Sequence, residues 1–376
     1  MSGACDACLR RGYLIGLLSA RIAGLTGRPG APSELFALED GALCEAVGGA
    51  GRQEGLAFLG RFEPRRARAD LRHAGVAAIC RHHEGYPKAL EDLSDQPAVL
   101  FCRGRLELLA SIDDQPAVTV VGTRDATPYA IDVAHDIGRG LGVAGITTIS
   151  GMALGVDGAA HRGALGVRGA TIAVLGGGPD VPYPRSHRDL HRQIGESGLI
   201  VAELPPGQRP YRWSFPARNR LMAALARMTV VVEAGEASGT LITADFAQAL
   251  GRTLGAVPGR VSTGAARGSN RLLREGAAVV RDASDVLDEL FGAGAATSLP
   301  IEIAEPEIDP LERRLLDAVE SNLDIEAMST FAGLPVSETR AALGQLETRG
   351  LVCRDGLFGW RRTRRSPGRE VSGPRA

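Results

Sequence analysis

The chain has 376 residues, of which 44% are apolar and 23% are charged, and its formal net charge is −1 at pH 7. This length allows two or three domains with sizeable cores. The near-zero charge excludes a globally basic surface, so any contact with nucleic acid requires a local patch. No stretch reaches the roughly 18 to 20 apolar residues that span a membrane. We therefore expect a cytoplasmic protein whose cysteines are reduced.

The first 85 residues are expected to form a small helical domain. Leu14, Leu18 and Ile22 fall at helical spacing on one face, which predicts an amphipathic core helix. Shorter helices are expected at 43–47 and 56–62, and no strand alternation is evident. The arginines of this domain favour a solvated helix face, with contact to nucleic acid as the alternative.

A CxxC pair, Cys5 and Cys8, lies at the start of the chain. A zinc site needs four ligands. No second closely spaced pair of Cys or His residues is evident, although His82 and His83 adjoin and Cys80 is near. We therefore expect neither a metal nor a cofactor.

After a lead-in segment, the pattern changes from residue 116 onward to alternating strands and helices. This alternation predicts an α/β fold, a doubly wound Rossmann-like parallel sheet, within a domain at 86–291. Six strands are expected, at 117–121, 146–150, 171–175, 199–203, 228–233 and 253–257. Their carboxyl ends lead into turns of small or charged residues, so these turns should line one crevice.

The first of these turns, Gly122, Thr123 and Arg124, precedes a helix that Thr127 is expected to cap, with Pro128 at its first position. This arrangement is typical of phosphate binding. A GxGxxG dinucleotide fingerprint is the alternative, but VGTRDA lacks the second and third glycines.

The second turn contains Gly151, which allows close backbone approach, and Asp157 and His161 on one helical face. An Asp–His pair suggests catalysis. Because no Ser or Cys nucleophile accompanies it, we favour a polar link that holds the turn.

The stretch at 209–259 joins a basic, aromatic segment to a buried strand and a glycine turn that opens a helix at 241–250. Ser238, Gly239 and Thr240 should offer free N–H groups to a phosphate. A basic loop and then a helix are expected before the strand. The loop contains Arg212, Trp213, Phe215, Arg218 and Arg220. Arginine pairs with phosphate and rings stack on unpaired bases, which suits a single-stranded nucleic acid. The alternative is an ordinary loop whose aromatic rings fill the core.

The C-terminal part is expected to be a second globular region after a linker at 292–309. Helices are predicted at 311–319, 325–331 and 337–346, followed by two short strands within 351–360. This order predicts a winged-helix domain at 310–362. Its third helix mixes acidic and basic residues, so a protein contact is as well supported as base reading. The arginine-rich tail, 363–376, is expected to be disordered and to add nonspecific affinity for DNA.

A series of motifs carries a resemblance to a known family. In order they are VVGTRDATPYA, SGMALGVDGAAHRGAL, TIAVLGGGPDVPYP, FPARNR, VVVEAGEASGTLITADFAQALGR, AVPG and GSNRLLREGA. The region 85–290 thus resembles the DNA-processing protein A family, also called Smf. These cytoplasmic proteins bind incoming single-stranded DNA and hand it to the RecA recombinase. The resemblance implies such a role in natural transformation, a homodimer formed through the α/β domain, and no membrane association.

The resemblance also assigns site residues. It implies that Arg124 grips phosphate, that Phe215 stacks on a base, and that FPARNR forms a DNA loop whose Arg218, Asn219 and Arg220 surround the backbone. Arg212 stands where the family often has lysine, which retains the positive charge.

An enzyme of the same superfamily plan is the alternative function. Nucleoside-monophosphate phosphoribohydrolases have a PGGxGTxxE turn whose glutamate serves glycosidic chemistry. Here the counterpart is EASGTLITA, and Thr243 and Ala244 occupy the places where that glutamate would fall. The carboxylate needed for acid or nucleophilic catalysis is missing. We therefore expect a binding protein without enzyme activity.

Overall fold

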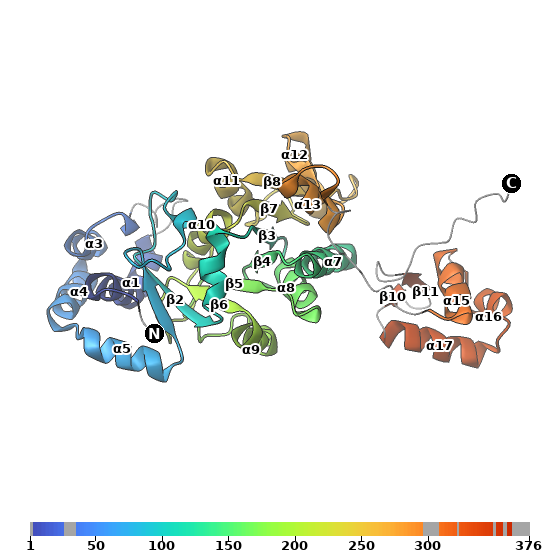
Figure 1. Ribbon diagram of the computed structural model, residues 1–376, viewed down its shortest axis with the longest axis horizontal. Helices are drawn as coiled ribbons and strands as arrows, with labels where there is room; N and C mark the ends of the chain where they lie inside the picture. The colour runs from blue at the N-terminus through green and yellow to red at the C-terminus, as the bar shows by residue number, and fades with distance from the viewer. Residues whose placement is uncertain are drawn as a thin grey trace. The chain divides into compact units, whose positions relative to one another are not determined.

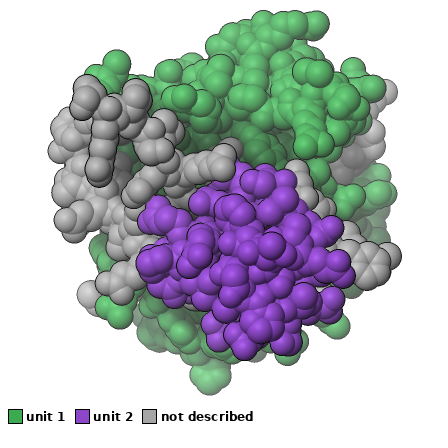
Figure 2. Space-filling model, turned by 90° about the vertical axis from the view of Figure 1, so that its right-hand side faces the viewer, with its two compact units in different colours: residues 1–301 green, residues 302–376 purple. Residues whose placement is uncertain are grey.

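The computed structural model describes residues 3–25, 35–295, 308–321, 323–348, 351–355 and 359–362. The chain divides into two compact units, residues 1–301 and residues 302–376 (Figure 2). Over these described ranges, no helix is long and apolar enough to cross a membrane. The expected basic tail, 363–376, and most of the expected linker lie outside the described residues.

One nine-stranded sheet organises the first unit, in the order β1-β2-β6-β5-β4-β3-β7-β8-β9 (Figure 1). Seven neighbouring strands, from β6 to β9 in this order, are parallel, and β2 and β1 extend the sheet with antiparallel pairing. The strands are β1 (Ala77–Cys80), β2 (Val99–Gly104), β3 (Ala117–Val121), β4 (Thr147–Ser150), β5 (Thr171–Leu175), β6 (Leu199–Ala202), β7 (Met228–Val231), β8 (Thr253–Ala256) and β9 (Ala278–Val279). All six predicted strands are present, so the predicted Rossmann-like sheet is confirmed.

Helices cover both faces of the sheet, as a parallel sheet requires. On one face, Val118 and Val120 of β3 pack with residues of α7, α8 and α13. On the other, Ala117 and Val121 pack with residues of α10, α11 and α12. Thr127 caps α7 as predicted, because its side chain accepts the Ala130 N–H. The helices are α6 (Glu107–Ala110), α7 (Pro128–Val143), α8 (Val156–Gly166), α9 (Arg188–Ser197), α10 (Ser214–Leu225), α11 (Leu241–Ala249), α12 (Arg267–Arg274) and α13 (Ala283–Phe291).

The N-terminal helices belong to the same compact unit as the sheet. They are α1 (Asp6–Leu25), α3 (Asp40–Val47), α4 (Gly49–Arg61) and α5 (Pro64–His73). The expectation that the first 85 residues lack a strand is wrong, because β1 pairs with β2 and forms one end of the sheet. A four-residue strand with the sequence AAIC shows no polar alternation, since it is buried along most of its length. The expected boundary at residue 85 therefore falls inside the unit.

The described residues of the second unit form three helices and an antiparallel pair of strands, as predicted. These elements are α15 (Pro310–Glu320), α16 (Ile325–Ala332), α17 (Val336–Thr348), β10 (Val352–Asp355) and β11 (Gly359–Arg362). Asp309 and Glu312 form a capping box at the start of α15. The assignment of this unit as a winged helix stays a prediction.

Candidate nucleic-acid interface

The candidate site lies where the strand order reverses. From β3 the chain proceeds through β4, β5 and β6 to one side, and through β7, β8 and β9 to the other. Ligands of open α/β sheets bind at the carboxyl ends of the strands beside such a reversal. A crevice of about 650 Å³ is found there. It is lined by ten of the residues predicted from the sequence: Gly122, Thr123, Arg124, Arg212, Phe215, Arg218, Asn219, Ser238, Gly239 and Thr240.

The turn after β3 is held at both ends by hydrogen bonds to Glu233, and Arg124 between these ends is exposed. The Thr123 N–H donates to the Glu233 carbonyl at 2.8 Å. The Thr127 N–H and hydroxyl donate to the Glu233 carboxylate at 2.9 and 2.8 Å. A Cβ at Gly122 would collide with Val156, which explains the glycine. Glu233, which the sequence analysis placed only at the end of a strand, thus holds the turn in position.

Arg124, Phe215 and Tyr183 form a connected group at the crevice. The Arg124 guanidinium carbon lies 5.1 Å from the centroid of the Phe215 ring. The Phe215 and Tyr183 rings are tilted at 43°, with centroids 5.4 Å apart. All three residues line both the crevice and an adjoining hollow of about 70 Å³. Tyr183 was not among the predicted site residues, although its place in the turn after β5 puts an aromatic ring at the same sheet edge.

The FPARNR segment is helical, which corrects the expectation of a loop. Helix α10 begins at Ser214 and includes the whole motif. Pro216 is compatible with this because its missing N–H has no helical partner in a first turn. Arg212 precedes the helix and is exposed. Arg218 and Arg220, two residues apart on a helix, point in different directions.

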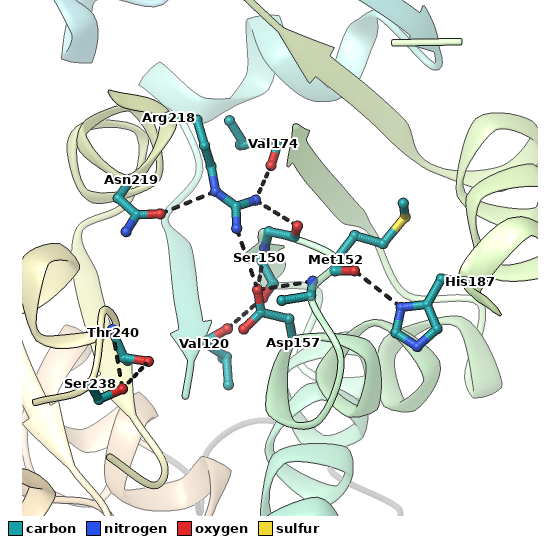
Figure 3. Close-up of polar contacts among 12 residues, drawn as sticks. Val120, Ser150, Met152, Asp157, Val174, His187, Arg218, Asn219, Ser238 and Thr240 are labelled. Carbon is teal, nitrogen blue, oxygen red and sulfur yellow. Dashed lines mark hydrogen bonds and ion pairs between the residues drawn. The ribbon is translucent and has the colours of Figure 1, made fainter. Parts of the chain in front are cut away.

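Arg218 is buried in the wall of the crevice, and Figure 3 shows its polar contacts. Its guanidinium donates to the carbonyls of Gly151 and Val174, and its Nε donates to Asn219 at 3.1 Å. A Cβ at Gly151 would overlap this guanidinium, so the glycine makes room for it. Burial lowers the pKa of Arg218 to about 10. Because this value is still well above neutral pH, the side chain stays charged. Arg218 therefore braces β4 and β5 while its charge faces the crevice.

Asp157 links the second turn to Arg218, so the favoured interpretation of a polar link that holds the turn is confirmed for Asp157 but not for His161. Its carboxylate accepts the N–H groups of Gly151 and Ala153 at 3.2 and 3.3 Å and lies 3.9 Å from an Arg218 nitrogen (Figure 3). His161 instead shares a hydrogen bond of 2.7 Å with the Thr171 hydroxyl. Burial lowers the pKa of His161 to about 3 and raises that of Asp157. The two residues do not form the Asp–His pair considered for catalysis.

Arg220 does not line the crevice, which corrects the prediction that it contacts phosphate. It is 1% exposed and forms ion pairs with Asp95 at 2.8 Å and Glu203 at 3.0 Å. Burial alone would lower its pKa, but the two carboxylates hold the pKa above the ordinary value. Its donors are used within the protein, and the residue joins the lead-in segment to α10.

The glycine turn before α11 offers fewer N–H groups than predicted. The Ser238 N–H donates to the Gly235 carbonyl at 3.1 Å, and the Thr240 N–H donates to the Ser238 hydroxyl at 3.3 Å (Figure 3). Gly239 is exposed and lines the crevice. The expectation of free N–H groups at Ser238 and Thr240 is therefore wrong.

Trp213 fills the core, in contrast to Phe215. It is 5% exposed, and its indole N–H donates to the Ser19 carbonyl of α1 at 3.0 Å. Its ring meets that of Phe36, with centroids 5.4 Å apart. The alternative that the aromatic residues of this segment fill the core thus holds for Trp213.

A set of potential metal ligands lies near the N-terminus. The ligand atoms of Cys5, Cys8, Cys80 and His82 all lie within 4.8 Å of one another. The expectation that the CxxC pair lacks further ligands is wrong, because folding brings the end of β1 beside the start of α1.

Comparison with known proteins agrees with this fold. Residues 77–291 match the family described as DNA recombination-mediator protein A. The chain is 40% identical over 204 residues to the DNA processing protein DprA of Streptococcus pneumoniae, an alignment covering 54% of this chain and 71% of that protein.

Two solved structures are also similar. The X-ray structure of DprA from Streptococcus pneumoniae has a TM-score of 0.59 and 29% identity, with 75% of this chain and 95% of the other covered. A structure of DNA processing protein A from Helicobacter pylori has a TM-score of 0.51 and 32% identity, with 57% and 95% covered. The Helicobacter pylori structure is described as giving insight into a single-stranded DNA binding mode.

Proposed function

Because the chain belongs to the DNA recombination-mediator protein A family, we propose that it binds single-stranded DNA in the crevice beside β3 and β7. The observation that carries this proposal is the group of Arg124, Phe215 and Tyr183, which places a cation and two rings along one opening. The Helicobacter pylori relative, whose structure concerns single-stranded DNA, supports the same ligand.

Each part of the crevice has a role in this proposal. Arg124 and Arg212 are exposed and contact phosphates, for which the guanidinium has a matching planar geometry. Phe215 and Tyr183 stack on unpaired bases, which tolerates any sequence. Buried Arg218 adds a fixed positive charge to the wall. Because these rings require bases free of pairing, the protein prefers single strands to duplex.

The proposal extends to the handover of DNA. The family is described as a recombination mediator, which supports delivery of the bound strand to the RecA recombinase during DNA uptake and recombination. Homodimer formation through the α/β domain, and a winged-helix role for the second unit, rest on the family resemblance. The proposal includes no catalytic step. The Asp157 carboxylate, which was considered for catalysis, accepts two backbone N–H groups and pairs with Arg218, and these contacts give it a structural role.

Binding of a fluorescent oligonucleotide tests the proposal. Anisotropy is measured with a single strand of thymidines and with a duplex of equal length, over a range of salt concentrations. We expect tighter binding of the single strand and an affinity that falls steeply with salt. Equal affinity for the duplex, in a protein that lacks residues 302–376, would contradict the proposal. Light scattering with and without the oligonucleotide tests the dimer.

A further inference from the structure

Three cysteines and one histidine from two distant segments meet in the structure. Cys5 and Cys8 stand at the start of α1, Cys80 ends β1, and His82 follows it. The His82 Nδ1 lies 3.5 Å from the Cys5 Sγ and 3.4 Å from the Cys8 Sγ. All four ligand atoms lie within 4.8 Å of one another. We propose that these residues form a structural zinc site.

The spacing of the donors fits a single tetrahedral ion. Bond lengths of about 2.3 Å for Zn–S and about 2.0 to 2.1 Å for Zn–N place a sulfur and a nitrogen of one tetrahedron about 3.5 Å apart. The two measured S···N distances agree with this value. Three soft sulfur donors and one imidazole suit Zn²⁺ and do not suit Mg²⁺ or Ca²⁺, which prefer oxygen. Four protein ligands complete the coordination, as in structural zinc sites.

The backbone around the donors is ordered by short-range contacts. The Leu9 N–H donates to the Cys5 carbonyl at 3.0 Å, which starts α1 and brings Cys8 one turn after Cys5. The His83 N–H donates to the Cys80 carbonyl at 2.9 Å, which turns the chain after β1. The Cys5 N–H points to the Cys80 sulfur at 3.4 Å. Such N–H contacts to a ligating sulfur stabilise its negative charge.

The site adds to an existing contact, because Cys8 and Leu9 of α1 share a buried cluster with Ala78 of β1. Cys8 and Cys80 are buried, whereas Cys5 is partly exposed and His82 is exposed. Arg68 of α5 donates to the Ala4 carbonyl at 2.9 Å and pairs with Asp6. Zinc would therefore fasten α1 to the end of β1, independently of what the crevice binds.

Metal analysis of the full-length protein tests this proposal. The protein is purified without chelators, and its zinc content is measured by inductively coupled plasma mass spectrometry. We expect one zinc per chain. His82→Ala should weaken zinc binding by more than about 100-fold, since even the loss of partners outside the ligand set weakens metal binding 10- to 100-fold. His82→Cys should retain zinc through four thiolates.

Two control variants separate the site from its surroundings. His83→Ala changes the neighbouring histidine, which bonds the Gly85 N–H and is not among the four ligands. Cys8→Ser removes one of the four proposed ligands. Cys44→Ser, which changes a buried cysteine outside this set, is its control. Both controls should keep one zinc. Because His82 is exposed, its variants should fold. Their zinc content therefore tests the proposed site even if Cys8→Ser does not fold.

Several results would overturn the proposal. One is a folded wild-type protein that contains no zinc and takes up none from added Zn²⁺. Others are iron in place of zinc, or a Cys5–Cys8 disulfide found by peptide mass spectrometry. A chelator should lower the Tm of the wild type and leave that of His82→Ala unchanged; an equal response of both would also contradict it.

Discussion

The guanidinium of Arg124 lies over the ring of Phe215, 5.1 Å from its centroid. Arg124 follows β3 and Phe215 lies in the first turn of α10, so the contact joins two segments that are far apart in the chain. A cation held over a ring in this way keeps both groups in position for a ligand that has alternating phosphates and bases. The two residues should therefore contribute to binding in ways that salt can separate.

Replacing Arg124 with alanine should lower both the affinity for single-stranded DNA and its dependence on salt. Each phosphate contact on a single strand contributes about 0.7 to the slope of log affinity against log salt. We expect the slope to fall by about that amount in anisotropy titrations. Arg227→Ala is the matched control, because this exposed arginine precedes β7 at the opposite end of the strands. An equal loss in both variants would assign the effect to overall charge.

Replacing Phe215 with alanine should weaken binding without changing the salt slope. A stacking ring contributes roughly 1 to 3 kcal/mol per base, and the substitution removes no charge. Thermal unfolding provides the control. A fully buried phenylalanine would cost about 3 to 5 kcal/mol of stability on truncation, and Phe215 is only partly buried. A variant that melts far below the wild type but binds normally in the cold would show that the ring serves the core.

Replacing Arg220 with methionine should destabilise the fold by about 3 to 5 kcal/mol, because Asp95 and Glu203 would be left buried without their partner. Denaturant unfolding measures this loss. The salt slope of DNA binding, measured where the variant is folded, should stay that of the wild type. A reduced slope with unchanged stability would instead return Arg220 to the phosphate contacts.

Lowering the pH should destabilise the protein through His161. Burial lowers its pKa from 6.5 to about 3, so the unfolded chain binds a proton below pH 6.5 that the folded protein does not. Stability is then lost as the pH falls from 6.5 towards 3, by about 2 kcal/mol at pH 5. His161→Gln should lose less stability than the wild type between pH 7.5 and 5 in urea unfolding. Parallel curves for the two proteins would contradict this assignment.

Removing residues 302–376 should leave most of the affinity for single strands intact, because the crevice lies entirely within the first unit. Anisotropy with the truncated protein tests this. Loss of nearly all binding would place the main DNA site in the second unit or in the tail.

The sequence predicted six of the seven parallel strands, most clearly the buried, β-branched runs such as AVTVV in β3, but it did not predict the two-residue strand β9. It also predicted the turns that line the crevice. It did not distinguish Arg218 from Arg220, since the two have the same chemistry and differ only in the direction that a helix gives them. It also did not predict that Asp95 pairs with Arg220, because the two residues are 125 positions apart and only the fold brings them together.

For a related reason, the clustering of Cys5, Cys8, Cys80 and His82 was not predicted. Cys5 and Cys80 are 75 residues apart, and their proximity depends on the position of β1 at the sheet edge. Both pairs lie close in sequence, with Cys5 and Cys8 three residues apart and Cys80 and His82 two residues apart, but a spacing rule does not show that the two pairs meet. That Cys80 and His82 lie beside the CxxC pair follows only from the folded structure, in which β1 ends near the start of α1.

The packing of α1 has a consequence for the synthesis of the protein. Leu14 and Leu18 share a core cluster with Leu204 and Trp213, nearly 200 residues further along the chain. At roughly 5 to 20 residues per second, the ribosome needs on the order of 10 to 40 s to supply these partners. Leu43 and Cys44 of the same cluster are available much earlier. The part of the apolar face of α1 that contacts Leu204 and Trp213 lacks these partners throughout that interval, which gives chaperones that recognise apolar surfaces time to bind the nascent chain.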